Sequence, residues 1–277
     1  PDPVSLLSVV ILTSLGTWGL PQMVQKFYAI DNEDSIKKGT IISTIFALVV
    51  SGGCYFLGGF GRLFSDKIDI AANGYDSIIP TMLENLHPLL IALVVILVLS
   101  ASMSTLSSLV IASSSTLTID LIKDNIVKEM SDKKQVFCIR VLIVIFIAIS
   151  AIIAIIQYKS AVTFIAQLMG ISWGALAGSF LAPFLYSLYW KKTTKAACWT
   201  SFIFGCIIMV LNLVAGSHFP TLLQSPITCG AFAMLAGLII VPVVSLFTKK
   251  PDTALIENTF ACYDKTNTVT QKTALGK

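Results

Sequence analysis

The sequence predicts an all-α integral membrane protein with seven transmembrane helices. Of its 277 residues, 55% are hydrophobic and only 12% are charged, about half of the roughly 25% charge of an average soluble domain. The mean hydropathy is +0.84. The apolar residues gather into runs of about 20, which is the length that crosses a bilayer as a helix. No run shows the ten-residue alternation of an outer-membrane barrel.

Seven runs have spanning length. They cover residues 4–24, 39–61, 88–112, 137–157, 162–189, 197–215 and 226–247. No Asp, Glu, Lys, Arg or His lies inside the apolar core of any of them. Proton pumps and proton-coupled carriers usually place such a residue in the membrane. Any ion bound by these helices is therefore expected on neutral oxygens, which suits Na⁺ better than a proton.

The first run contains a break. Its middle reads Gly16-Thr17-Trp18-Gly19-Leu20-Pro21-Gln22. Proline removes a backbone donor, and an interrupted helix at membrane depth must turn its freed backbone groups to a cavity or a ligand. A simple proline kink, satisfied by neighbouring helices, is the alternative.

The second run, residues 39–61, is uninterrupted and leads into a long loop over residues 62–87. Asn73-Gly74, Pro80 and Pro88 are the breakers in and after this loop. We expect a short surface helix from Ile78 to Leu86.

The third run is rich in hydroxyl groups, with eleven Ser or Thr among residues 100–118. Ala101, Ser104, Thr105 and Ser108 recur at the spacing that places residues on one helical face. The Ser104 and Thr105 hydroxyls, with the Ala101 carbonyl one turn back, would make half of an oxygen cage. The alternative is that these side chains pack membrane helices together.

A polar segment precedes the fourth run, and a stripe of small residues lies within the fifth run. Residues 119–135 mix both charges and are expected on the cytoplasmic face of the membrane. In the fifth run, Gly170, Gly174 and Gly178 recur every four residues, which allows close helix packing. Gln167 either forms a hydrogen bond between helices or contacts the solute.

The sixth and seventh runs are continuous, and the tail from Pro251 is polar and weakly patterned, so we expect it to be mostly disordered.

Most of the six cysteines lie in apolar runs without metal-ligand spacing, which predicts small buried hydrophobes. They are Cys54, Cys138, Cys198, Cys206, Cys229 and Cys262. No nucleophile–base pair or phosphate loop indicates an enzyme. The opening Pro1-Asp2-Pro3 is no signal peptide and looks like the start of a piece of a longer protein.

The basic residues predict the orientation. If the first run leads inward, 16 of the 19 Lys and Arg residues fall on one side of the membrane. The positive-inside rule then puts the N-terminus outside and the C-terminus in the cytoplasm. Because these residues flank spans, the net charge of +4 does not point to nucleic acid.

Three motifs, in order, resemble the sodium/solute symporter family, which includes proline, pantothenate, sialic-acid and sugar carriers. They are the broken helix Gly16–Gln22 followed by Gln25-Lys26-Phe27-Tyr28-Ala29, the stretch Ala101–Ser108 continuing to Thr118-Ile119-Asp120-Leu121, and the helix end from Leu181-Ala182-Pro183-Phe184 to Tyr189-Trp190-Lys191-Lys192-Thr193-Thr194.

The resemblance implies the five-plus-five inverted-repeat fold of leucine-transporter-like carriers. Residues 1–190 would be the second inverted repeat, residues 191–250 two peripheral transmembrane helices, and residues 251–277 a polar cytoplasmic tail.

It also implies Na⁺-coupled uptake of a small organic solute (an amino acid, a carboxylate or a sugar) across the cell membrane. Ala101, Ser104 and Thr105 would bind the coupling Na⁺. The solute would meet Thr17, Trp18, Gln22 and Gln167.

Other membrane functions give different expectations. A retinal protein would need a lysine in its last span, and none lies between Ala196 and Thr248. A carrier-fold sensor domain would need a signalling domain after the tail. An uncoupled channel would pass solute regardless of the sodium gradient.

Overall fold

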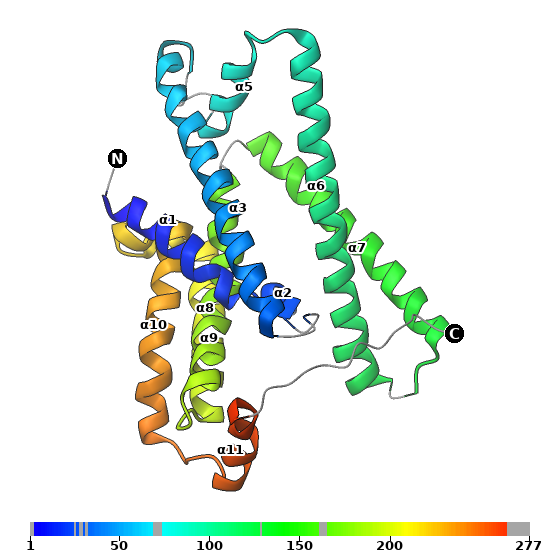
Figure 1. Cartoon of the computed structure of the whole chain (residues 1–277), viewed down its shortest axis with the longest axis vertical. Coiled ribbons are helices and arrows are strands. Elements are labelled where there is room, and N and C mark those ends of the chain that lie inside the picture. Colours follow the sequence, from blue (N-terminus) through cyan, green and yellow to red (C-terminus); the bar gives the residue numbers. More distant parts are fainter. Residues whose placement is uncertain are drawn as a thin grey trace. The chain divides into compact units, whose positions relative to one another are not determined.

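A computed structural model describes residues 3–24, 26–27, 30, 33–68, 74–127, 129–160 and 165–264. Over these residues the regular secondary structure is helical, without a strand (Figure 1). The all-α prediction is therefore confirmed for the described part of the chain.

The described residues include six helices that are long and apolar enough to cross a membrane, one fewer than the seven expected. They cover Asp34–Phe64, Pro88–Ile126, Asp132–Ile156, Gln167–Tyr189, Lys195–His218 and Pro226–Phe247. Residues Pro3–Gly19 form a shorter apolar helix instead. The first expected span falls short because its helix is interrupted before it reaches spanning length.

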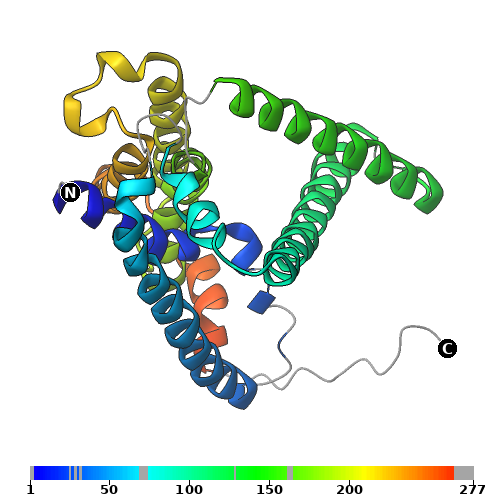
Figure 2. The same ribbon diagram turned by 90° about the horizontal axis from the view of Figure 1, so that it is seen from above.

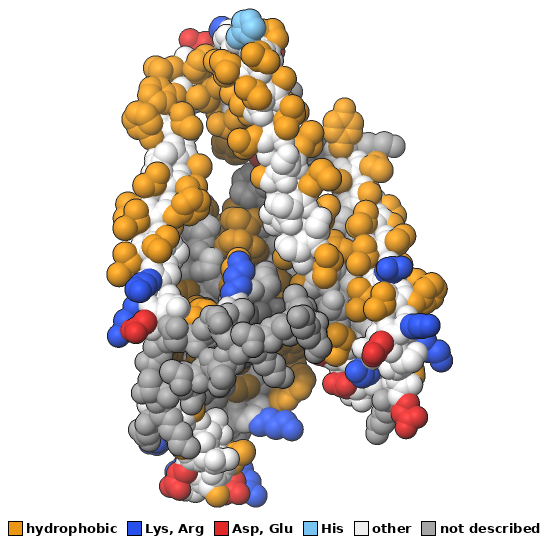
Figure 3. Space-filling view, turned by 45° about the vertical axis from the view of Figure 1, so that its right-hand side comes forward, with side chains coloured by type: hydrophobic (Ala, Val, Ile, Leu, Met, Phe, Trp, Pro, Cys, Tyr) orange, Lys and Arg blue, Asp and Glu red, His pale blue; other side chains and the backbone are white. Residues whose placement is uncertain are grey.

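The chain divides into two compact units. The first combines Pro1–Gly53 with Ile165–Lys277, and the second is Cys54–Phe164. Helix α3 (Glu33–Gly59) runs across the boundary between them. Hydrophobic side chains cover the helix shafts and basic side chains gather near helix ends (Figure 3), as expected of helices that cross a bilayer.

The first unit is built around three helices, α8 (Ile165–Tyr189), α9 (Lys195–Ala215) and α10 (Pro226–Phe247). Figures 1 and 2 show them side by side, with α1 (Pro3–Gly16) lying against α8 and α10. The buried side chains of the bundle are mostly small or flexible. They include Ala177, Leu181, Ala182, Ala197, Met209, Ala233, Met234 and Val241.

Glycine lets these helices touch backbone to backbone. A Cβ on Gly174 would lie 2.8 Å from the Cα of Gly230, and one on Gly205 would lie 2.6 Å from the carbonyl oxygen of Gly178. A Cβ on Gly170 would meet the backbone nitrogen of Ile227 at 2.9 Å. The close packing predicted from the glycine spacing is therefore confirmed, with α9 and α10 as the partners of α8.

Hydrogen bonds fasten one end of the same bundle. Tyr186 Oη donates to the Leu238 carbonyl at 2.8 Å. The Thr194 and Thr248 hydroxyls lie 2.6 Å apart, and the Thr194 N–H donates to Ser245 Oγ at 3.3 Å. These bonds tie the end of α8 and the start of α9 to α10.

The expectation of a disordered tail is wrong for residues 253–264, which form α11 (Thr253–Phe260) and a 3₁₀ turn (Ala261–Asp264). The Asp252 side chain caps α11 by accepting from the Ala254 N–H at 3.1 Å. Tertiary contacts add to this cap: Tyr263 Oη donates to the Leu188 carbonyl at 2.8 Å, and Lys191 Nζ lies 5.4 Å from the centre of the Phe260 ring. Residues 265–277 lie outside the described part.

The second unit begins with short helices and continues into two long ones. A 3₁₀ helix (Phe60–Lys67) and a 3₁₀ turn (Tyr75–Ser77) precede α5 (Ile78–Leu83), which confirms the expected surface helix, although it ends before Leu86. Asn73 lies outside the described residues.

Helix α6 (Pro88–Thr116) begins beside His87, whose ring accepts from the Leu89 N–H. It passes into a π-helix (Leu117–Ile126), so the segment expected only as a charged surface stretch starts as helix. Helix α7 (Asp132–Ser160) follows.

The cysteines match their expectation only in part. Cys229 is buried, whereas Cys54 and Cys262 are exposed in this chain and the other three are intermediate. The expectation of small buried hydrophobes is thus met by Cys229 and is wrong for the two exposed residues, which lie on surfaces that the chain does not cover.

We predict that Gly205→Ala lowers the thermal stability of the full-length protein in detergent, because its Cβ would overlap the Gly178 backbone. Overpacking of this kind costs about 1–3 kcal/mol. Gly216→Ala is the matched control, since the Cβ it adds would come no closer than 3.7 Å to its neighbours. Equal unfolding temperatures for the two variants would contradict the close contact between α8 and α9.

Candidate ion and solute sites

The third expected span carries a cluster of three oxygen atoms within α6. Ser104 Oγ donates to the Ala101 carbonyl at 2.9 Å, and Thr105 Oγ1 donates to the same carbonyl at 3.1 Å. The hydroxyls and the carbonyl thus meet on one side of one helical turn. All three residues are exposed in this chain.

This geometry leaves the hydroxyls able to accept. A hydroxyl has one proton and two lone pairs, and here each proton is directed at the Ala101 carbonyl. The lone pairs of Ser104 and Thr105 remain for a further partner. The same internal bonds are also usual for Ser and Thr that merely pack in membrane helices. The ion-binding role of Ala101, Ser104 and Thr105 therefore stays a prediction.

The broken helix is the second site feature. α1 ends at Gly16, residues Thr17–Gly19 form a 3₁₀ turn, and Leu20 has an extended backbone (φ −90°, ψ 113°). A short helix, α2 (Pro21–Val24), then begins. Proline suits this first helical position, because its ring fixes φ and the missing N–H is not needed there. The interruption lies within residues 16–22, where the sequence predicts a break.

Gly19 seats the break against α8. A Cβ at this position would lie 2.8 Å from the Ala177 Cα and 2.9 Å from the Leu181 Cβ. Leu20 is fully buried beside it. Only glycine fits here, so the interrupted backbone and α8 are in direct contact.

Trp173 lies against the end of α1, a neighbour of the break that sequence reasoning missed. Its ring and the Met234 side chain both lie 3.4 Å from the place where a Gly16 Cβ would stand, so α8 and α10 together close around the end of α1. A large aromatic among the small residues of the glycine stripe was the available signal.

The structure brings three of the four expected solute residues to the break. Trp18 is 57% exposed, and Thr17 and Gln22 are half-buried. The Thr17 hydroxyl donates to the Ser14 carbonyl at 3.2 Å. Of the basic-aromatic run that follows, Lys26 and Phe27 are described, whereas Gln25, Tyr28 and Ala29 lie outside the described residues.

Gln167 lies elsewhere. It is half-buried on α8, ten residues before the Ala177 that contacts Gly19. Ten helical residues span about 15 Å. Its expected solute contact remains a prediction, and the structure does not bring it to the break.

The chain matches a known family. The family model for the sodium:solute symporter family matches residues 1–205. The osmoregulated proline transporter OpuE of Bacillus subtilis is 26% identical over 250 residues, which cover 89% of this chain and 49% of that protein. The high-affinity proline transporter PutP of the same organism is 28% identical over 257 residues, covering 90% of this chain and 52% of the relative.

A sodium/proline symporter of Staphylococcus aureus is also 28% identical over 257 residues, covering 88% of this chain and 49% of its own length. The chain thus spans about half the length of these curated relatives. No solved structure matches it significantly.

We predict that Gly19→Ala separates the break from α8 and lowers the thermal stability of the full-length protein, again by about 1–3 kcal/mol. Gly16→Ala is the neighbouring control, because its Cβ would make only ordinary contacts at 3.4 Å. Unfolding temperatures measured in detergent compare the two. If Gly19→Ala melted no lower than Gly16→Ala, the contact between the break and α8 would be disproved.

Proposed function

Since this chain belongs to the sodium:solute symporter family, we propose that it forms part of a secondary transporter that couples the entry of a small organic solute to the entry of Na⁺. The observation that carries this proposal is the oxygen cluster of Ala101, Ser104 and Thr105 on α6. Neutral oxygens in a span core without ionisable side chains suit a hard monovalent cation. The Ala101 carbonyl accepts both hydroxyl protons here, so it joins the Ser104 and Thr105 oxygens as a ligand when a hydroxyl turns away from it. Even three oxygens do not fill a cation shell, so the proposed site includes further ligands from outside α6.

L-Proline is the first solute to test, because the named relatives include proline transporters and a sodium/proline symporter. The wider class remains amino acids, carboxylates and sugars. At the break, the exposed Trp18 ring offers an apolar face, while Thr17 and Gln22 offer hydrogen-bonding groups. Interrupted helices bind the polar ends of solutes through freed backbone groups. As a solute contact, we rank Gln167 below the residues at the break, because it lies away from the break.

The architecture that goes with this function is the five-plus-five inverted repeat. Residues 1–190 are the second repeat, residues 191–250 two peripheral helices and residues 251–277 a cytoplasmic tail. The lysine distribution supports an external N-terminus in the cell membrane. The break at Gly16–Leu20 supports the assignment of the first helix as the interrupted helix of that repeat.

Coupling follows from differential affinity. A ligand shifts a conformational equilibrium only as far as it binds one state better than the other. Na⁺ binding at α6 stabilises an outward-open state, in which the break near Trp18 accepts the solute. Closure of the outer loop and opening of the inner side then release both.

We predict that NaCl raises the unfolding temperature of the full-length protein more than equal KCl or choline chloride does. A ligand at a hundred times its Kd stabilises by about 2.7 kcal/mol. The double variant Ser104→Ala, Thr105→Ala should lose this sodium-specific rise. Ser113→Ala should keep it, because nine residues at 3.6 per turn place Ser113 on the opposite face from Ser104. Retention of the full rise in the double variant would refute the ion site.

We also predict that Trp18→Ala raises the apparent KM for proline at least tenfold in proteoliposomes and leaves the sodium-specific thermal shift unchanged. The variant removes an apolar face from the solute site and leaves α6 intact. Uptake with and without an imposed sodium gradient is the measurement. Solute flux that ignores the gradient would instead indicate a channel, and the same KM in variant and wild type would exclude Trp18 from the solute site.

A further inference from the structure

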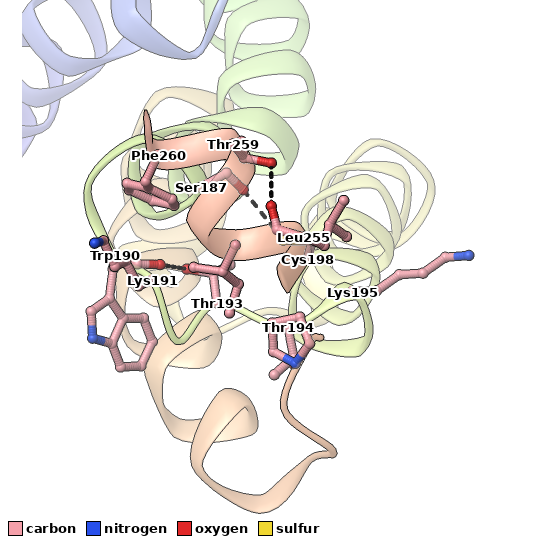
Figure 4. Close-up of a pocket in the computed structure, with 12 residues that line it drawn as sticks. Ser187, Trp190, Lys191, Thr193, Thr194, Lys195, Cys198, Leu255, Thr259 and Phe260 are labelled. Atoms are coloured by element: carbon pink, nitrogen blue, oxygen red, sulfur yellow. Dashed lines mark hydrogen bonds between the residues drawn. The ribbon is translucent and has the colours of Figure 1, made fainter. Parts of the chain in front are cut away.

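A cavity of about 300 Å³ lies in the first unit, and no residue of the break lines it. Its walls are the end of α8, the turn over residues 190–194, the start of α9 and the tail helix α11 (Figure 4). The apolar side of the wall comes from α11, through Leu255, Ile256 and Phe260. Two lysines, Lys191 and Lys195, also line it.

The level of this cavity is fixed by the spans around it. The spanning helix α8 ends at Tyr189, and the next begins at Lys195. Trp190, the residue between an aromatic span end and two lysines, also lines the cavity. Aromatic residues followed by lysines mark the headgroup level of a bilayer. The cavity therefore lies where lipid headgroups lie.

The lysines at the cavity hold charge that the described residues do not neutralise. Lys191 lies over the Phe260 ring at 5.4 Å, a cation–π contact that leaves its charge in place. No ion pair joins Lys191 or Lys195 to a carboxylate within the described ranges. In Figure 4, Lys195 extends outward from the rim. Lys192, Lys249 and Lys250 stand close by in sequence, against Asp252, Glu257 and Asp264 on the tail side.

The hydroxyl groups of the cavity already have partners. Thr193 Oγ1 donates to the Trp190 carbonyl at 2.9 Å, and Thr194 Oγ1 lies 2.6 Å from Thr248 Oγ1. Ser187 Oγ lies 3.8 Å from Cys198 Sγ. Among the side chains that line the cavity, the lysine ammonium groups are thus the charged donors that remain for a ligand.

We propose that this cavity, the tail cavity, binds an anionic phospholipid. Its phosphate lies at the rim, where the flexible side chains of Lys191 and Lys195 turn inward from their present positions to contact it. Its glycerol or acyl part lies against Leu255, Ile256 and Phe260. An apolar wall next to uncompensated lysines fits an amphiphile with a negative head better than a free inorganic anion, which has no apolar part. Basic pockets beside transmembrane helices bind lipid headgroups in this way. The cavity shares no residue with the proposed Na⁺ and solute sites, so the proposal does not depend on the proposed function.

Thermal unfolding of the full-length protein in detergent tests the site, with added dioleoyl phosphatidylglycerol compared with dioleoyl phosphatidylcholine. Phosphatidylglycerol should raise the unfolding temperature more. Lys191→Gln with Lys195→Gln should remove more than half of that difference. Lys37→Gln with Lys38→Gln, the matched control, should keep it, because these lysines change the charge equally and do not line the cavity.

A second variant tests the volume of the cavity independently of its lysine charges. Thr259→Trp fills the cavity and keeps both lysines, so it should also reduce the phosphatidylglycerol effect. Equal shifts with the two lipids, or an unchanged phosphatidylglycerol effect in both cavity variants, would overturn the proposal. Inorganic phosphate that alone reproduces the shift would show a free-anion site and overturn the lipid assignment.

Discussion

The structure of the first unit depends on how closely α8 approaches its neighbours. Helix axes in a membrane have no hydrophobic drive to come together, so packing contacts must supply the attraction. In this chain, glycine on α8 meets glycine on α10 at Gly174 and Gly230, and Gly205 of α9 meets the backbone at Gly178. Because Gly19 meets α8 at Ala177 and Leu181, the interrupted helix is seated by the same kind of contact.

Polar bonds complement this packing at the helix ends. Along the shafts, the Ser and Thr hydroxyls mostly bond within their own helix, as Ser107 does to the Met103 carbonyl. Between helices, the bonds concentrate where α8, α9 and α10 meet near Thr194 and Tyr186. The opposite end is bonded too, since the Asn212 amide of α9 donates to the Leu223 carbonyl at 2.7 Å. The bundle is therefore close-packed in its middle and hydrogen-bonded at its ends, and α11 folds on the end near Thr194.

Much of this was predictable from composition and spacing. Apolar run lengths located the spans, the Gly and Pro residues of 16–22 located the break, and the spacing of Gly170 to Gly178 predicted close packing. Hydropathy could not predict α11, because that short helix depends on contacts with residues about 70 positions earlier, such as Tyr263 with Leu188. Nor could it separate Gln167 from the break, since polarity does not say which turn of α8 faces Gly19. The ligand shell of the proposed ion likewise needs atoms beyond the Ser104 turn.

For the proposed Na⁺ site, the hydrogen bonds that Ser104 and Thr105 make to Ala101 bear on the speed and cost of capturing a charge. Bulk water must turn its dipoles around an arriving ion, and that turning is part of the work of solvation. Here the helix has already oriented two hydroxyl dipoles, with their negative ends away from the shared carbonyl. The hydroxyl dipoles of this turn of α6 are therefore oriented before an ion arrives, because their reorganisation was completed when the helix formed.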